Sequence, residues 1–128
     1  MTKKLIMILG LVLSSMLMKA QAFFVPFPKA GDKYWQKQVP VAMRNDYIRL
    51  GNLYQKKPWN AIPAETFAEF RTNGNRTRYE EASFGIRKQF VCLVMAEIMQ
   101  GRGRFLSSIR KGLYYFIEKE PWWGIPAH

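Results

Sequence analysis

The sequence contains one cysteine, one histidine and few acidic residues, and signals for β-strands are nearly absent from it. A single cysteine excludes an internal disulfide, and Cys92 lies in the apolar run FVCLVMA, so we expect a buried and unreactive thiol. No metal-ligand, phosphate-loop or nucleophile motif stands out, so we predict no metal and no cofactor. There is also no low-complexity tract and no clear internal repeat. The near absence of strand signals favours an all-α protein.

Positive charge is what the sequence has in excess, with 20 Lys+Arg against 9 Asp+Glu in 128 residues. Three of the lysines fall in residues 1–22, so residues 23–128 keep 17 basic and 9 acidic side chains, a net charge of +8. A basic surface raises the local concentration of polyanions and speeds their capture. Net charge can also serve solubility alone, and the charge by itself does not separate these two interpretations.

Residues 1–22, MTKKLIMILGLVLSSMLMKAQA, have the order of a secretory signal peptide: a basic start, an apolar stretch and an A-x-A site. We expect cleavage after Ala22. An uncleaved anchor is the alternative, but the apolar core is short for a span of ~20 residues, and Ser14 and Ser15 interrupt it. The mature protein is then periplasmic or secreted, with membrane contact through the signal peptide only. In that compartment anionic polysaccharide or an anionic membrane surface is a better partner for the basic surface than nucleic acid.

The rest of the chain divides into an irregular segment followed by helices. Residues 23–40, FFVPFPKAGDKYWQKQVP, are expected to be irregular, because proline fixes φ and removes a backbone donor. From residue 41 the apolar spacing is helical, although Gly51 weakens the first helix. The predicted helices cover residues 41–57, 63–73, 77–99 and 105–120, with breaks at KPWNAIP, NGN and QGRGR.

The last two predicted helices are the best defined. Thr77 and Glu80 have the spacing of a capping box at the start of the first one. Two apolar-faced helices joined by a short glycine turn should pack as an antiparallel hairpin. The side chains predicted to form the buried stripes are Tyr79, Ile86, Phe90, Leu93, Val94 and Ile98 in the first helix, and Leu106, Ile109, Leu113, Phe116 and Ile117 in the second.

The aromatic content is high for a small closed bundle, with 9 Phe, 6 Tyr and 4 Trp. An open solenoid or ring of helical hairpins explains it better, because each hairpin leaves one face for its neighbour. Exposed aromatics on an unpaired face predict self-association.

The candidate binding residues lie at two places. Trp122 and Trp123 present rings on which sugars could stack, and His128 could line a cleft, although packing of the tryptophans and a structural histidine are the alternatives. Arg76 and Arg78, with Arg87 and Lys88 further along the helix, offer guanidinium groups that suit carboxylate and sulfate. A solvated face is the alternative for each of these cations. Tyr114 and Tyr115 are expected to pack.

The order of several motifs resembles a known family. DYIRLGNLYQKKPW at 46–59, NRTRYEE at 75–81, the helix hairpin and the W-x-x-P-A-H close at 123–128 resemble the beginning of the helical domain of heparinase II/III-like polysaccharide lyases. The resemblance implies that residues 41–128 are the incomplete beginning of an (α/α) toroid, which a β-sandwich follows in complete members. It also implies β-elimination on uronic-acid polysaccharides such as glycosaminoglycans.

In that family the catalytic tyrosine, histidine, and asparagine or glutamate lie further along the chain than this sequence reaches. We therefore expect no catalytic residue in this chain and no activity from it alone. The alternatives are a non-enzymatic basic helical module that binds anionic glycans or membrane surfaces, and a purely structural helical protein.

Overall fold

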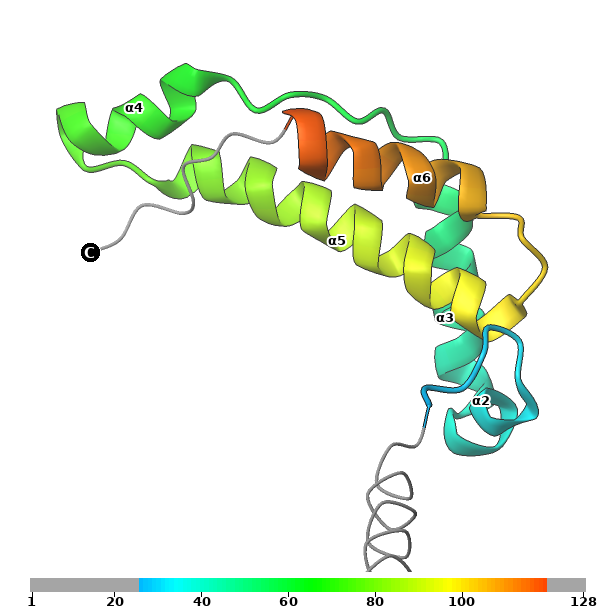
Figure 1. Ribbon diagram of the computed structural model, residues 1–128. Helices are drawn as coiled ribbons and strands as arrows, with labels where there is room; N and C mark the ends of the chain where they lie inside the picture. Colours follow the sequence, from blue (N-terminus) through cyan, green and yellow to red (C-terminus); the bar gives the residue numbers. More distant parts are fainter. Residues whose placement is uncertain (1–25, 120–128) are drawn as a thin grey trace, which may run out of the picture.

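The computed structural model describes residues 26–119, and over this range the chain is helical and contains no strand (Figure 1). The prediction of an all-α fold is confirmed. The signal peptide and the candidate residues Trp122, Trp123 and His128 lie outside the described residues. None of the described helices is both long and apolar enough to cross a membrane. The elements are α2 (Lys33–Gln38), α3 (Val41–Tyr54), α4 (Ala64–Asn73), α5 (Thr77–Gln100), α6 (Leu106–Tyr114) and a π-helical turn, η1 (Tyr115–Lys119).

The main packing contact is the crossing of α3 over the second half of α5 (Figure 1). Gly51 of α3 lies at this crossing, where an added Cβ would overlap the Cβ of Ala96 and come within 3.0 Å of the Phe105 ring. The glycine that weakens the helix locally therefore allows the two helices to approach closely. The core at this crossing consists of Leu93, Ala96 and Phe105, against which Tyr54, Trp59 and Ile109 pack.

The helices α5 and α6 run antiparallel side by side, as the sequence predicts (Figure 1). Gly101 ends α5 in the left-handed conformation, with φ of 61°. The Glu97 carboxylate then fixes the turn, because its oxygens accept the backbone N–H groups of Gly103 at 2.6 Å and Phe105 at 3.0 Å. The buried carboxylate thus takes the place of the carbonyls that these N–H groups would otherwise need.

The predicted buried stripe of α6 and η1 is confirmed in part: Ile109 and Phe116 are half-buried and packed, but the other three members are wrong. Leu106, Leu113 and Ile117 are exposed, and the buried side of α6 and η1 runs through Phe105, Gly112 and Tyr115. Gly112 explains the difference, because its missing side chain leaves room for the rings of Trp59 and Phe90. This close contact turns the glycine inward and the leucines outward.

The start of α5 also differs from the prediction. The residue before the helix is Arg76, and no side-chain cap of the Thr77–Glu80 type forms. Instead, the Asn75 Oδ1 accepts the Thr77 N–H at 3.1 Å, and Glu80 pairs with the Arg76 guanidinium. The capping box is lost because a cationic partner takes the glutamate and the asparagine supplies the cap.

Residues 26–40, the described part of the segment 23–40, are only partly irregular. Within it Asp32 accepts the Tyr34 N–H at 2.7 Å and starts α2, which the proline content did not predict. The preceding loop lies against the end of α5, where the Gly31 N–H donates to the Ile98 carbonyl at 2.8 Å. The Phe27 and Trp35 rings contact each other with centroids 5.3 Å apart.

Candidate anion-binding groove

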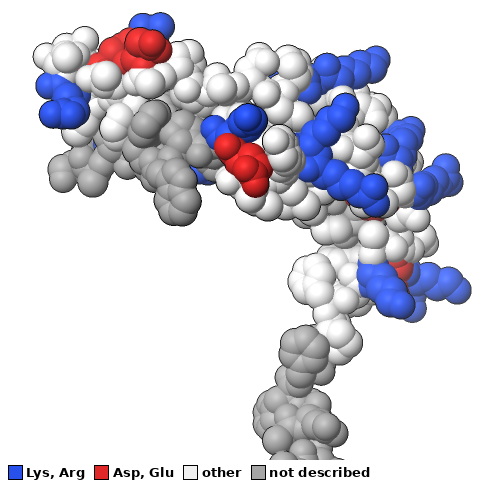
Figure 2. All heavy atoms as spheres, turned by 45° about the horizontal axis from the view of Figure 1, so that its top comes forward, with Lys and Arg blue, Asp and Glu red and all other residues white. Residues whose placement is uncertain are grey.

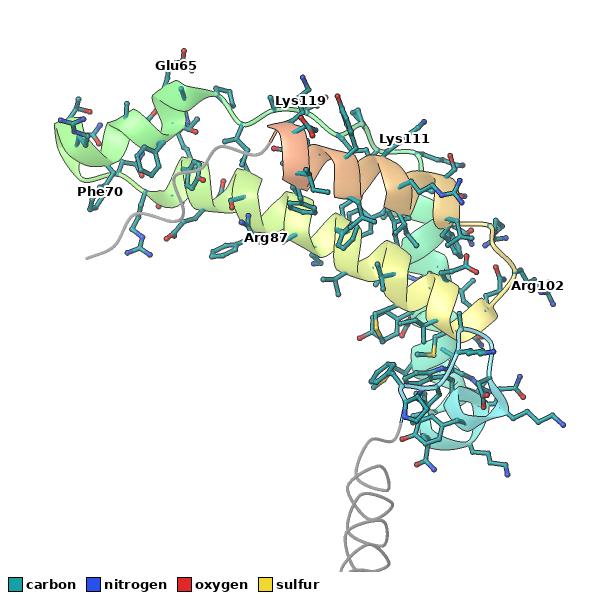
Figure 3. The ribbon with its side chains drawn as sticks, viewed as in Figure 1. Glu65, Phe70, Arg87, Arg102, Lys111 and Lys119 are labelled. Carbon is teal, nitrogen blue, oxygen red and sulfur yellow. The ribbon has the colours of Figure 1, made fainter. Side chains whose placement is uncertain are left out.

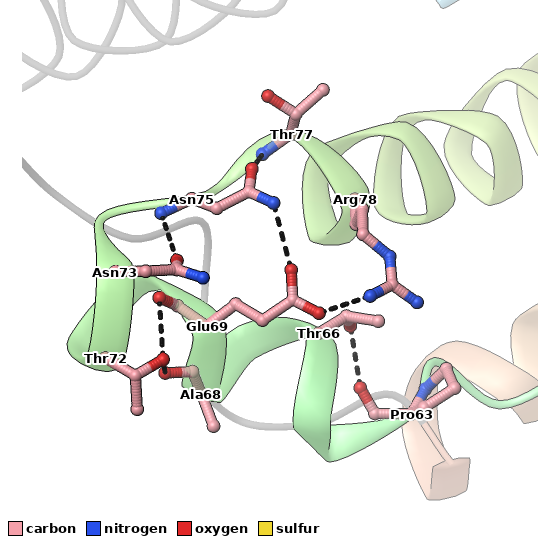
Figure 4. A network of polar contacts seen from close by, with 9 residues as sticks. All are labelled: Pro63, Thr66, Ala68, Glu69, Thr72, Asn73, Asn75, Thr77 and Arg78. Atoms are coloured by element: carbon pink, nitrogen blue, oxygen red, sulfur yellow. Dashed lines mark hydrogen bonds and ion pairs between the residues drawn. The ribbon is translucent and has the colours of Figure 1, made fainter.

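The two predicted site arginines that the structure describes are engaged with carboxylates of their own chain. Arg78 Nη1 lies 2.5 Å from Glu69 Oε1, and the second oxygen of Glu69 accepts from Asn75 at 3.0 Å (Figure 4). Arg76 pairs with Glu80. These contacts join α4 and the Asn73–Arg76 turn to the start of α5, which is a structural role. Ligand binding by Arg76 and Arg78 stays a prediction.

The other two cations of that predicted cluster lie further along α5. Arg87 donates to the Ser83 carbonyl at 3.3 Å and places its guanidinium 6.0 Å from the centroid of the Phe116 ring. Lys88 is exposed on the next position. The structure therefore does not gather Arg76, Arg78 and Arg87 into one site.

A different group of cations meets in a groove of about 760 Å³ between the segment after α3 and the α6–η1 helix. We call it the basic groove. Figure 3 shows Lys111 and Lys119 along the edge of α6 and η1 that faces this segment. Its lining contains five cations, Lys56, Lys57, Arg110, Lys111 and Lys119, together with Gln55, Pro58, Trp59, Ser108, Tyr114 and Tyr115.

The charge of the basic groove is not balanced by its own walls. Within residues 26–119 no carboxylate lines the groove and none of the five cations forms an ion pair, and all five are exposed. Lys57 places its ammonium 5.1 Å from the centroid of the Tyr54 ring. Figure 2 shows Lys and Arg side chains gathered over the half of the face where α6 and the end of α3 lie. Like charges held together attract an anion from solution.

The wall formed by the segment after α3 is held in place by a buried amide. Gln89 of α5 donates to the backbone carbonyls of Lys57 at 3.1 Å and Tyr54 at 3.4 Å. Across the groove, the Ser108 hydroxyl donates to the Gln55 carbonyl at 3.5 Å. These contacts connect α5 and α6 to the chain that carries Lys56 and Lys57.

Two residues that line the groove, Trp59 and Tyr115, belong to an aromatic cluster. The ring centroid of Trp59 lies 6.4 Å from that of Phe90, 6.1 Å from Tyr115 and 6.3 Å from Phe116. Phe90 and Phe116 also meet edge to face, with centroids 5.2 Å apart. These ring contacts pack the segment after α3, through Trp59, against α5 and η1.

The groove is suited to binding an anion through charge and hydrogen-bond donation. Arg110 supplies a planar fork of donors that matches carboxylate and sulfate, and the lysines add compact charges. Among residues 26–119 no cluster of side chains could hold a metal ion. Cys92 is buried as predicted, and this burial raises the pKa of its thiol, while nearby Lys88 lowers it.

Sequence reasoning missed this groove because its cations come from two places about fifty residues apart. Lys56–Lys57 and Arg110–Lys111 are ordinary basic pairs in the sequence. A signal was available in the aromatic residues that accompany each pair, Trp59 and Tyr114. Packing was predicted for both tyrosines of α6 and η1: it is confirmed for buried Tyr115 and wrong for Tyr114, which is 59% exposed.

No protein-family model and no curated protein matches this chain. The resemblance to heparinase II/III-like lyases therefore stays a prediction from the sequence.

Proposed function

We propose that this protein binds anionic polysaccharide in the basic groove without chemical conversion by the groove residues. The observation that carries the proposal is the meeting of five exposed cations in one groove, where, among residues 26–119, they form no ion pair and no carboxylate lines the walls. An anion that enters this groove removes the repulsion among the cations and gains ionic hydrogen bonds.

Two further features support a polysaccharide as the anion. The predicted signal peptide directs the protein to a compartment where glycans are more abundant than nucleic acid. The volume of about 760 Å³ is within the range of pockets for small organic ligands, so the groove has room for a few sugar units of a longer chain.

The test is a charge reversal on both walls of the groove. We expect Lys56→Glu together with Lys111→Glu to weaken binding to a heparin oligosaccharide by roughly tenfold or more, because two attractions become repulsions. The matched control is Lys33→Glu with Lys37→Glu on α2, which changes the net charge equally outside the groove. Isothermal titration calorimetry gives both affinities. Equal losses in the two variants would show attraction by net charge and would contradict a groove site.

As a second proposal, the chain is the first part of a β-eliminating lyase with an (α/α) toroid. The α5–α6 hairpin favours it, because Leu106, Leu113 and Ile117 present an exposed apolar side, as a hairpin does when it packs against a neighbouring one. The absorbance of an unsaturated uronate product on glycosaminoglycan or alginate is the test. We expect no product from this chain, and product formation would contradict the prediction that it is inactive alone.

A further inference from the structure

Tyr114 differs from the other aromatic residues that line the basic groove. Trp59 is half-buried and Tyr115 is buried, whereas the Tyr114 side chain is 59% exposed. Trp59 and Tyr115 pack in ring pairs of the aromatic cluster, and no ring pair within residues 26–119 contains Tyr114. The groove thus contains one aromatic side chain that the described residues leave mostly exposed.

The position of Tyr114 on α6 places this side chain beside positive charge. Arg110 and Lys111 precede it by four and three residues, and side chains at these spacings are neighbours on a helix surface, with Cβ atoms about 5–6 Å apart. That separation matches one pyranose ring with a carboxylate or sulfate on its edge. A sugar acid can therefore lay its C–H face on Tyr114 while its anionic group reaches Arg110.

We propose that Tyr114, Arg110 and Lys111 form a subsite for a single anionic sugar unit, in which the sugar ring stacks on Tyr114. This inference rests on the proposed function, and it identifies the sugar ring as the part of the ligand that the groove recognises besides its charge. Charge alone would accept any polyanion, and the exposed aromatic side chain selects polyanions that contain rings.

Single-stranded nucleic acid also combines rings with negative charge, since its bases stack on aromatic side chains. The groove favours a sugar acid because Arg110 and Lys111 lie about one helical turn from the Tyr114 ring. In a nucleotide the phosphate lies a whole sugar away from the stacked face, whereas a uronate or sulfate is attached directly to the stacked ring.

The experiment measures the affinities of the full chain and of Tyr114→Ala for three probes at one salt concentration: a heparin tetrasaccharide, a linear polyphosphate of equal charge and a short thymidine oligonucleotide. We expect Tyr114→Ala to weaken tetrasaccharide binding roughly three- to tenfold, the range of one aromatic contact. Polyphosphate binding should change less than twofold. Tyr114→Phe keeps the ring and should bind the tetrasaccharide as the unaltered chain does.

Each other outcome overturns the subsite. An unchanged tetrasaccharide affinity in Tyr114→Ala would show that no ring stacks there, and an equal loss for polyphosphate would show a disturbed groove. Tighter binding of the oligonucleotide than of the tetrasaccharide would assign the groove to nucleic acid. The charge reversal of Lys56 and Lys111 tests the groove separately from the subsite. If the groove binds anions, this reversal lowers the affinity for all three probes, even if Tyr114→Ala has no effect.

Discussion

At the scale of single residues, the polar side chains that the fold buries decide the local geometry. Glu97 and Gln89 are 6% and 4% exposed, and each accepts or donates two hydrogen bonds to the backbone of a neighbouring segment. Sequence reasoning did not select them, because a glutamate or glutamine within a helix is an ordinary surface residue until the partner segment is known.

Replacement of Glu97 by glutamine should destabilise the protein by about 1–3 kcal/mol. The amide group of glutamine has one oxygen, so its NH₂ group would face the N–H of Gly103 or Phe105 and leave a buried donor without an acceptor. Urea denaturation measures the free energy of unfolding. Glu81→Gln is the control, because Glu81 is exposed on the same helix, and an equal loss there would contradict the role of Glu97.

Cys92 should react slowly with a thiol reagent in the folded protein and quickly in denaturant. Burial raises the pKa of its thiol, although Lys88 lowers it, so the folded chain holds less thiolate than a free cysteine at the same pH. As pH rises, the Cys92 thiol loses its proton in the unfolded chain before it does so in the folded protein. The contribution of Cys92 to the free energy of unfolding is therefore unchanged below the unfolded pKa, and it is lost as pH rises through the folded pKa. Equal labelling rates with and without denaturant would contradict the burial.

At the scale of elements, the sequence predicts the helices well and their faces poorly. The bounds of α3, α4 and α5 follow from local apolar spacing and from the breaks at prolines and glycines. The rotation of α6 does not, because it depends on Trp59, which packs against Gly112 from a segment far away in the sequence. When a helix has apolar residues on two sides, the packing partner decides which of the two sides is buried.

Two helical glycines, one at the crossing of α3 and α5 and one away from close neighbours, should respond to alanine in opposite directions. Gly51→Ala should destabilise the protein by about 1–3 kcal/mol, because the new methyl group overlaps Ala96 and this overpacking exceeds the gain of up to ~1 kcal/mol in helix propensity. Gly85→Ala on α5 meets no atom within 4 Å and should stabilise the protein by about 0.5–1 kcal/mol. Thermal and urea unfolding measure both, and a stabilised Gly51→Ala would contradict the close crossing.

At the scale of the whole molecule, the fold brings together charges that the sequence keeps apart. The excess of basic residues predicts an anionic partner, but it does not predict where the partner binds. The sequence favoured Arg76 and Arg78, which the structure shows paired with Glu80 and Glu69. The basic groove appears only when α6 returns along α5 and faces the end of α3.

The affinity of the groove should fall steeply with salt. The screening length shrinks from ~10 Å at 0.1 M to ~3 Å at 1 M, so exposed lysines lose most of their attraction for the polyanion. We expect elution from a heparin column at a salt concentration that the reversal of Lys56 and Lys111 lowers more than the reversal of Lys33 and Lys37 does. No retention at low salt would contradict glycan binding.

The measurement that tests the central claim most directly is a nuclear magnetic resonance titration of the full chain with an anionic oligosaccharide. Binding in the basic groove predicts that the largest amide shift changes lie in Gln55–Trp59 and in Ser108–Lys119, on both walls of the groove. Changes that centre on Asn75–Arg78 instead, or that spread evenly over all basic residues, would contradict the groove as the binding site.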